Sequence, residues 1–236
     1  MTHQQMALDV ALDDDLDFDH FVPGHNEELV NQLRRLAKGE ISTPVLFVWG
    51  EPGSGKSHLL HACHRAAVDT GRGAYYLDLE SAIEQQTDRS ELETIGDEAV
   101  ICVDGLDAAA GSADWQERLF RLCNFARDQQ RSVIISATCP PTRLGLTLRD
   151  LVTRLMVGLT YQVLPLNDNQ KIGALQERAM HRGFELNETA ARYLLERYPR
   201  QTGYLFGVLD KLDRASLEQK RVVTIPFLRS LDRDKG

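Results

Sequence analysis

Short apolar runs recur along the first two thirds of the chain, and each is followed by a segment with apolar residues at helical spacing. The runs fall at residues 45–49, 74–79, 99–103, 132–136 and 161–164. Runs of this length that alternate with amphipathic segments are typical of βαβ units around a buried parallel sheet. We therefore predict a three-layer α/β fold in which helices cover both faces of a parallel sheet.

The pattern changes after Pro165, where the strand signals stop. Three helical patterns follow at about 168–182, 187–197 and 202–218, with a short one after Pro226. We expect a small all-helical subdomain over residues 166–236, preceded by an α/β subdomain over residues 17–165. Residues 1–16 are acidic and lack aromatic side chains, so we expect a flexible tail there.

The chain is acidic, with 27 basic and 35 acidic residues and a formal net charge of −8. Because non-specific duplex binding depends on Lys and Arg, this charge predicts no strong direct binding to duplex DNA or anionic membranes. No run approaches the roughly 20 apolar residues of a membrane span, and the N-terminus lacks an apolar signal core, so we expect a cytoplasmic protein. Wide spacing favours buried free thiols at Cys63, Cys102, Cys123 and Cys139.

A glycine-rich loop follows the first apolar run. Its sequence, GEPGSGKS, is the G-x-x-x-x-G-K-S pattern in which backbone N–H groups, a lysine and a serine hydroxyl hold a nucleotide with Mg²⁺. We predict binding of ADP or ATP and assign it to Gly50, Gly53, Ser54, Gly55, Lys56, Ser57 and His58. A metal site at His58, His61 and His64 is the alternative for these histidines, although no acid or cysteine completes a familiar spacing.

Asp104 ends the apolar run 99–103 and matches the acid of a Walker B motif. We predict that Asp104 and Ser57 bind the Mg²⁺, with a capping or turn role for Asp104 as the alternative. Hydrolytic members of this class usually place a carboxylate directly after the metal-binding acid, but Gly105 cannot accept a proton. Asp107 can act as the general base instead only if it lies within hydrogen-bond reach of the attacking water.

Several segments together resemble the AAA+ module of bacterial DnaA initiators. They are residues 18–24 (FDHFVPG), the glycine-rich loop, Asp104, the Pro140-Pro141 pair, residues 151–155 (LVTRL) and the helical C-terminal part. Residues 182–186 (RGFEL), 209–216 (LDKLDRAS) and 224–227 (TIPF) are more similar to the Hda group of regulatory inactivators of DnaA. The resemblance covers about residues 16–230 and implies a P-loop AAA+ module followed by a helical lid subdomain.

The resemblance also implies roles for residues outside the loop. Phe21, Val22 and Pro23 match the segment that lines the adenine pocket, with a simple strap over the core as the alternative. Thr138 lies at the sensor 1 position near the terminal phosphate, although a turn role is also open. Arg154 matches the arginine finger, which stabilises charge on the phosphoryl group of a neighbouring subunit's nucleotide; a surface ion pair is the alternative.

Two departures from the DnaA pattern restrain the analogy. Gly203 stands where relatives carry the sensor 2 arginine, which leaves Arg200 three residues upstream. Together with Gly105, this predicts a subunit that holds nucleotide well and hydrolyses it poorly alone. The chain ends shortly after the lid, so we expect no helix-turn-helix DNA-binding domain and no origin recognition.

The N-terminal tail resembles the short peptide that docks on the replicative sliding clamp. Such a peptide is extended, and it offers a glutamine amide and alternating apolar side chains to a pocket. We assign this role to Gln5, Met6, Leu8 and Val10, with a featureless tail as the alternative.

Taken together, these features predict a negative regulator of replication initiation that forms homo-oligomers. Tethered to the clamp, it presents Arg154 to ATP bound on DnaA and so accelerates hydrolysis. Two alternatives remain open. One is an autonomous helicase-loader-like or DNA-binding ATPase, and the other is an interaction scaffold that uses ADP only to set its shape.

Overall fold

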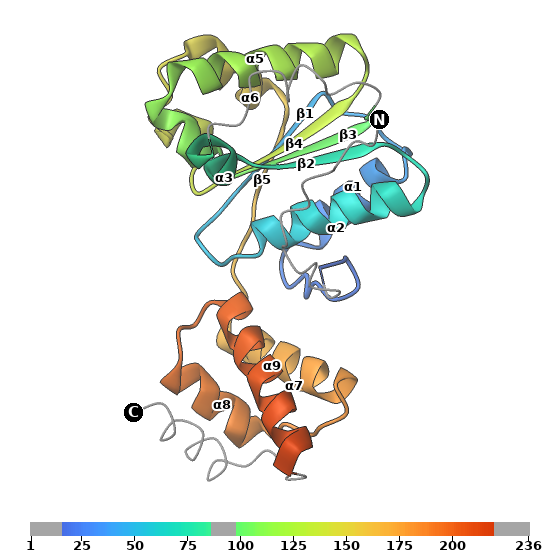
Figure 1. Ribbon diagram of the computed structural model, residues 1–236, viewed down its shortest axis with the longest axis vertical. Helices are drawn as coiled ribbons and strands as arrows, with labels where there is room; N and C mark the ends of the chain where they lie inside the picture. The colour runs from blue at the N-terminus through green and yellow to red at the C-terminus, as the bar shows by residue number, and fades with distance from the viewer. Residues whose placement is uncertain (1–15, 86–97, 220–236) are drawn as a thin grey trace. The chain divides into compact units, whose positions relative to one another are not determined.

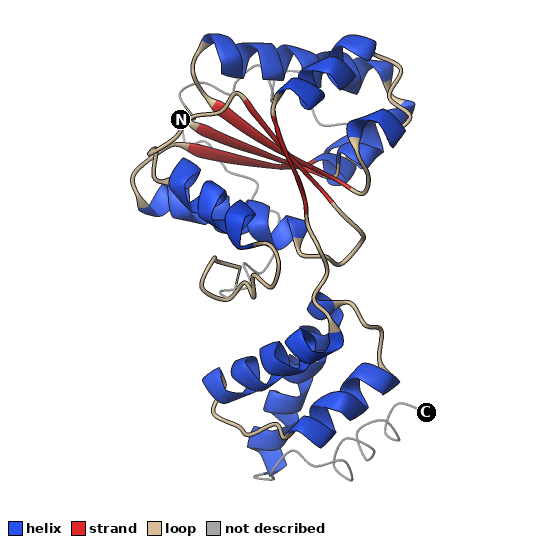
Figure 2. Ribbon diagram, turned by 180° about the vertical axis from the view of Figure 1, so that it is seen from behind, coloured by secondary structure: helices blue, strands red, loops and turns tan. Residues whose placement is uncertain are grey.

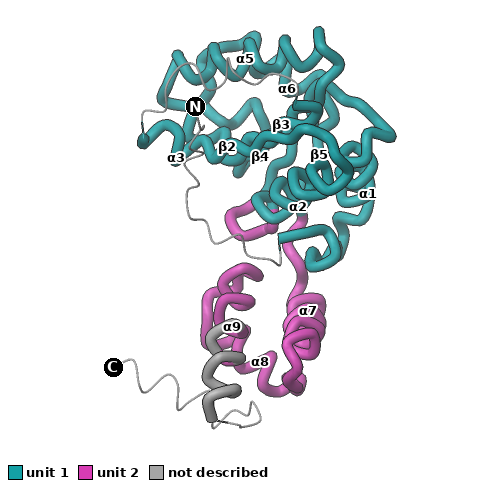
Figure 3. Tube along the Cα trace, turned by 45° about the vertical axis from the view of Figure 1, so that its right-hand side comes forward, with its two compact units in different colours: residues 1–50, 56–163 teal, residues 51–55, 164–236 magenta. Residues whose placement is uncertain are grey.

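The computed structural model describes residues 16–85 and 98–219. The chain divides into two compact units, residues 1–50 with 56–163 and residues 51–55 with 164–236 (Figure 3). The clamp-peptide residues predicted in the tail and the helix predicted after Pro226 lie outside the described residues.

Unit 1 is built on a parallel sheet (Figures 1 and 2). Its described strands are β1 (Val45–Trp49), β2 (Ala74–Asp78), β3 (Val100–Asp104), β4 (Ser132–Ala137) and β5 (Leu159–Gln162). They lie in the order β2-β3-β4-β1-β5, and all neighbours pair in parallel. The predicted α/β class is confirmed, although β5 begins and ends two residues earlier than the sequence pattern predicts.

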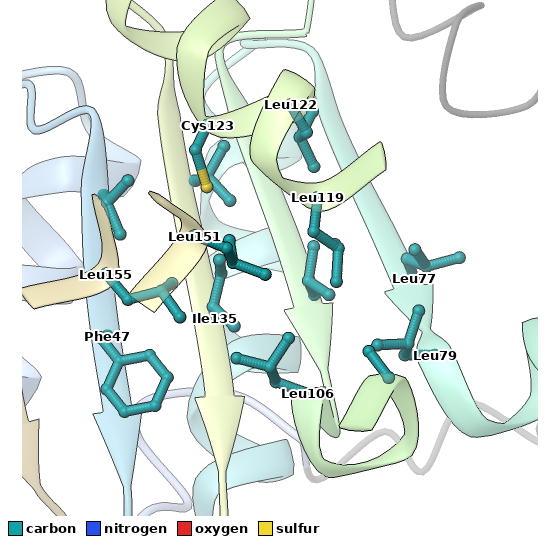
Figure 4. Close-up of a cluster of buried hydrophobic side chains, with 14 of the residues drawn as sticks. Phe47, Leu77, Leu79, Leu106, Leu119, Leu122, Cys123, Ile135, Leu151 and Leu155 are labelled. Carbon is teal, nitrogen blue, oxygen red and sulfur yellow. The ribbon is translucent and has the colours of Figure 1, made fainter. Parts of the chain in front are cut away.

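Helices cover both faces of this sheet, which confirms the three-layer prediction (Figure 1). Phe47 of β1 belongs to one core cluster with Leu119 and Leu151 (Figure 4), whereas Leu46 belongs to the cluster with Leu59 on the other face, because side chains alternate along a strand. The helices of this unit are α1 (Glu27–Ala37), α2 (Lys56–Asp69), α3 (Leu79–Glu84), α5 (Ala113–Asp128) and α6 (Arg149–Val157), with 3-10 turns η1 (Leu106–Gly111) and η2 (Pro141–Arg143).

Unit 2 contains the helices α7 (Asp168–His181), α8 (Glu188–Arg197) and α9 (Thr202–Gln219), each within a residue of the predicted bounds. Local signals start the first two. Asn167 forms a capping box with Gln170, and the Asn187 side chain accepts a hydrogen bond from the backbone N–H of Ala190. The three helices bury a core of their own that includes Ile172, Leu175, Leu186, Leu194, Leu205 and Leu209.

Two further predictions concern the described residues as a whole. Cys63, Cys102 and Cys123 are free and buried, as predicted, whereas Cys139 is free and only partly buried. Over the ranges 16–85 and 98–219, no helix has the length and apolar character required to cross a bilayer.

Candidate nucleotide site

The glycine-rich loop connects the carboxyl end of β1 to the first turn of α2. The Gly50 N–H donates to the Ala137 carbonyl (3.2 Å), which ties the start of the loop to the end of β4. Gly53 and Gly55 have φ values of +76° and +102°, a region that side chains with a Cβ rarely adopt. The loop therefore requires glycine at these two positions for its own shape, before any ligand is considered.

Lys56 is the positive charge of this site. Its ammonium group donates to the Gly50 carbonyl (2.8 Å) and is half buried. Burial lowers the Lys56 pKa from its ordinary value, while the nearby Asp104 and Asp107 carboxylates act in the opposite direction. The structure therefore places one lysine facing two acids at the strand ends.

Asp104 is held in place from both neighbouring strands. The Tyr76 hydroxyl of β2 donates to Asp104 Oδ2 (2.8 Å), and the Ser136 hydroxyl of β4 donates to Oδ1. The Gly105 N–H in turn donates to Ser136 Oγ (2.9 Å). Burial raises the Tyr76 pKa, and the Asp104 charge raises it further, so the phenol stays a hydrogen-bond donor.

Asp107 and Thr138 form a second pair at the same edge of the sheet. The Thr138 backbone N–H donates to Asp107 Oδ2 (2.9 Å) and Oδ1 (3.2 Å), and the Thr138 hydroxyl also donates to Oδ1. The turn that carries Asp107 begins after Gly105, whose φ is +81°. The two positions predicted for sensor 1 and for a substitute base therefore contact each other directly.

These residues fit a nucleotide with Mg²⁺. The Ser54 hydroxyl is buried and has no hydrogen-bond partner among the described residues, so a donor is left for a ligand. Ser57 is exposed in the first turn of the 14-residue helix α2, whose N-terminus favours phosphate charge. A serine hydroxyl and the Asp104 carboxylate are oxygen ligands of the kind that Mg²⁺ combines with water and phosphate.

Two of the histidines of α2 make contacts with backbone and aromatic groups of the protein. His58 Nε2 lies 2.6 Å from the Asp17 carbonyl, and the Phe21 ring packs edge-on against His58 with centroids 5.3 Å apart. His61 stacks on Tyr76 at 4.0 Å. No cluster of three or more His, Cys, Asp or Glu suited to a metal occurs within residues 16–85 and 98–219, so the alternative of a histidine metal site has no support.

The segment predicted to line the adenine pocket runs past the start of α2. Phe21, Val22 and Pro23 are each half-buried, and Phe21 packs against the core cluster that contains α1 and α2. The backbone just before this segment also contacts α2, through the Asp17 carbonyl and His58. Both the pocket wall and the strap over the core agree with this placement.

Arg154 lies apart from these groups. Its Nη2 donates to Asn124 Oδ1 of α5 (2.8 Å), and the side chain is partly buried. Because α5 runs from the carboxyl end of β3 back to the amino end of β4, Asn124 in its later turns lies toward the amino ends of the strands. The phosphate loop follows the carboxyl end of β1. Phe125, which follows Asn124 in the sequence, is exposed, and so are Met156 and Val157 at the end of the helix that carries Arg154.

Tyr76 and Ser136 are the site residues that the sequence did not single out. Each lies on a strand next to β3, and each contacts Asp104 only because of the strand order and register. A hydroxyl within each neighbouring apolar run is the one signal that could have pointed to them.

Two family models match the chain. The model described as the bacterial DnaA ATPase domain matches residues 12–162, and the model described as the Hda lid domain matches residues 168–231. Together they account for both parts of the fold. The sequence resemblance to DnaA-related AAA+ proteins, and to Hda in the lid, is therefore confirmed.

Solved DnaA structures share the fold. Domain III of DnaA from Thermotoga maritima is 20% identical with a TM-score of 0.77, covering 90% of this chain and 93% of that chain. DnaA from Aquifex aeolicus, bound to AMPPCP, is 20% identical with a TM-score of 0.69, covering 87% and 68%. A DnaA initiator bound to AMPPCP and single-stranded DNA is 19% identical with a TM-score of 0.71, covering 89% and 69%.

Proposed function

This chain belongs to the bacterial DnaA ATPase-domain family and has a lid of the Hda type, and from that membership we propose that it regulates DnaA. In this proposal it binds ADP or ATP with Mg²⁺ and stimulates the hydrolysis of ATP bound to DnaA. The stimulating group is the Arg154 guanidinium, supplied to the nucleotide of the neighbouring protein.

Nucleotide binding is supported by the glycine conformations, by Lys56 and by the Asp104 carboxylate held between two hydroxyls. Two of the solved DnaA proteins with this fold bind AMPPCP, an ATP analogue. In this chain the loop N–H groups and Lys56 would hold the phosphates, while Ser57 and Asp104 would hold Mg²⁺. The metal neutralises phosphate charge when it is bound.

The observation that carries the regulatory proposal is the position of Arg154. Through its contact with Asn124 it lies toward the amino ends of the strands, whereas its own phosphate loop follows the carboxyl end of β1. Its described partner is the neutral amide of Asn124. A guanidinium that leaves a carboxylate loses an ion pair, whereas one that leaves an amide loses a hydrogen bond to a neutral acceptor, which costs less. This position, with no competing acid on Arg154 among the described residues, supports action on another protein.

Slow hydrolysis by the chain alone follows from Gly105 and from the contacts of Asp107. Gly105 offers no carboxylate, and the Asp107 carboxylate already accepts two hydrogen-bond donors from Thr138. A general base requires a free lone pair directed at the attacking water. The role of this chain's own nucleotide is then to stabilise the fold that presents Arg154.

The clamp tether and the oligomeric state complete the proposal. Gln5, Met6, Leu8 and Val10 would dock on the sliding clamp, and self-association would use the same AAA+ surfaces as association with DnaA. A pull-down on the clamp tests the tether. The Gln5→Ala, Leu8→Ala double variant is expected to lose retention, and retention equal to that of the intact chain would remove the tether from the proposal.

The test of the regulatory function is turnover of DnaA-bound ATP with clamp and DNA present. Arg154→Ala is expected to lose stimulation while binding ADP as well as the parent protein. Arg149→Ala is the matched control, because Arg149 is an exposed arginine in the first turn of the same helix. Equal losses in the two variants would reduce the effect of Arg154 to surface charge.

The alternative is an autonomous ATPase that binds single-stranded DNA, since one of the solved DnaA initiators with this fold is bound to a single strand. It predicts fast turnover by the purified chain and an affinity for single strands that falls steeply with salt. The net charge of −8 and the glycine at position 105 favour the regulatory proposal over this one.

A further inference from the structure

The contact between Asp107 and Thr138 fixes the direction of one proton. A threonine hydroxyl has a single proton to donate, and an ionised carboxylate can only accept. Since the Thr138 hydroxyl and the Thr138 N–H both donate to Asp107, the hydroxyl faces the rest of the site with lone pairs alone.

This direction matters because a terminal phosphate oxygen is also only an acceptor. Two acceptors cannot hydrogen-bond to each other, so the Thr138 hydroxyl requires a donor between itself and the phosphate, such as an ordered water. Asp107 also adds a negative charge close to Lys56, and that charge repels a third phosphate. The missing donor and the added charge both act against a third phosphate.

The backbone around Asp107 holds it against the end of β4. Gly105 takes a left-handed conformation and starts the turn that carries Asp107. Its N–H donates to Ser136 Oγ, two residues before Thr138, so the ends of β3 and β4 are joined at two successive points. The Asp107–Thr138 pair is thus held at the carboxyl ends of β3 and β4.

We propose that Asp107 is a positioning residue that commits the Thr138 proton to itself, so that the Thr138 hydroxyl meets the terminal phosphate only through a bridging water. The proposal rests on the nucleotide site proposed above. It gives Asp107 a role other than that of a general base, and it makes the relative affinity for ATP and ADP depend on the pair.

The test measures the dissociation constants of ADP and ATP with Mg²⁺ by titration calorimetry. Asp107→Asn removes the charge and can donate to Thr138 through its amide, which releases the hydroxyl proton toward the phosphate. One hydrogen bond to a charged group is worth about 1.5–3 kcal/mol, so the ATP affinity should rise about tenfold relative to ADP. Thr138→Val in the Asp107→Asn background should remove most of that gain, and Thr138→Ser should retain it.

Asp69→Asn is the matched control, because Asp69 is exposed at the far end of α2 and its substitution removes the same charge. Thr138→Val alone gives a second readout that does not depend on the folding of Asp107→Asn. If that single change weakens ATP tenfold while ADP is unaffected, the hydroxyl donates directly to the terminal phosphate and the proposal is overturned. An unchanged ratio in Asp107→Asn also overturns it.

Failure of the nucleotide site itself has a different signature. If the parent protein binds neither ADP nor ATP, the proposed function fails before the pair is tested. If the parent binds both and only the predicted change in ratio is missing, the nucleotide site stands and this inference alone is lost.

Discussion

The strand ends and the surface around Arg154 treat charge in opposite ways. At the strand ends Asp104 and Asp107 each accept hydrogen bonds from hydroxyl groups, and both face Lys56. Around Arg154 one cation contacts a neutral amide, on two helices that also carry the exposed apolar side chains of Phe125, Met156 and Val157. The first arrangement holds a bound group in place, whereas the second leaves a charge available to another molecule.

This difference separates binding from action within unit 1. The two regions lie at opposite ends of α5, which begins near the carboxyl ends of the strands and carries Asn124 in its later turns. A change at one end should therefore leave the other end intact, provided that the core between them stays folded. Substitutions in each region test that independence, from the largest expected effect to the smallest.

Lys56→Ala should give the largest effect on nucleotide affinity. Loss of a charged donor to phosphate is worth about 1.5–3 kcal/mol, which is roughly ten- to hundredfold in the dissociation constant. Titration with a fluorescent ADP derivative measures it. Arg154→Ala is the comparison and should bind ADP within about twofold of the parent, since Arg154 lies away from the loop. A large loss in both variants would show that the two regions are coupled.

Asn124→Asp should restrain the Arg154 side chain by turning the neutral contact into an ion pair. The Arg154 hydrogen bond is already charge-assisted, and a carboxylate adds the attraction of an ion pair, up to about 1 kcal/mol, so stimulation of DnaA-bound ATP hydrolysis should fall about fivefold. Asn124→Ala serves as the control and should retain most of the stimulation, because it removes the restraint instead of strengthening it. Faster stimulation by Asn124→Asp than by Asn124→Ala would contradict the account.

Gly105→Ala should lower the free energy of unfolding by about 1 kcal/mol, because a Cβ in the left-handed region is strained. No atom lies within 4 Å of the place where the Cβ would stand, so strain and not a clash sets the cost. Urea unfolding measures it. Gly111→Ala, which also meets open space but has no positive φ, should cost less. Equal costs would argue against the left-handed turn.

Stability should fall as the pH drops through about 6.5, because burial lowers the pKa of both His61 and His64 below that ordinary value. The unfolded chain takes up protons in this range more readily than the folded chain, so the free energy of unfolding falls. Thermal unfolding at pH 5.5 and 7.5 tests this. His61→Phe, which keeps a ring against Tyr76, should narrow the difference in melting temperature between the two pH values. The same difference in the variant as in the parent protein would refute the role of His61.

Buried strands and the phosphate loop were predictable because continuous apolar runs and glycine spacing are local signals. The β5 strand was predicted two residues too late because it is an edge strand of the described sheet, and Leu159 at its start is exposed. Val163, whose apolar character led to the later prediction, is buried but lies just after the strand. An apolar pattern reports burial, and at an edge burial and strand pairing do not coincide.

The partners of the site residues were not predictable for a different reason. Lys56 and Asp104 belong to motifs, but the hydroxyls of Tyr76 and Ser136 reach Asp104 only through the strand order β2-β3-β4 and its register. The same applies to Asp107 and Thr138, which are 31 residues apart in the sequence. Spacing along one segment carries no information about contacts between strands.

The central claim is that Arg154 acts on the nucleotide of another protein, and single-turnover hydrolysis tests it most directly. DnaA is loaded with ATP labelled on the terminal phosphate, freed of excess nucleotide, and mixed with saturating chain, clamp and DNA. The account predicts that Arg154→Ala still binds DnaA but slows the stimulated rate by about 10³-fold or to that of DnaA alone. A rate at saturation equal to that of the parent protein would contradict it.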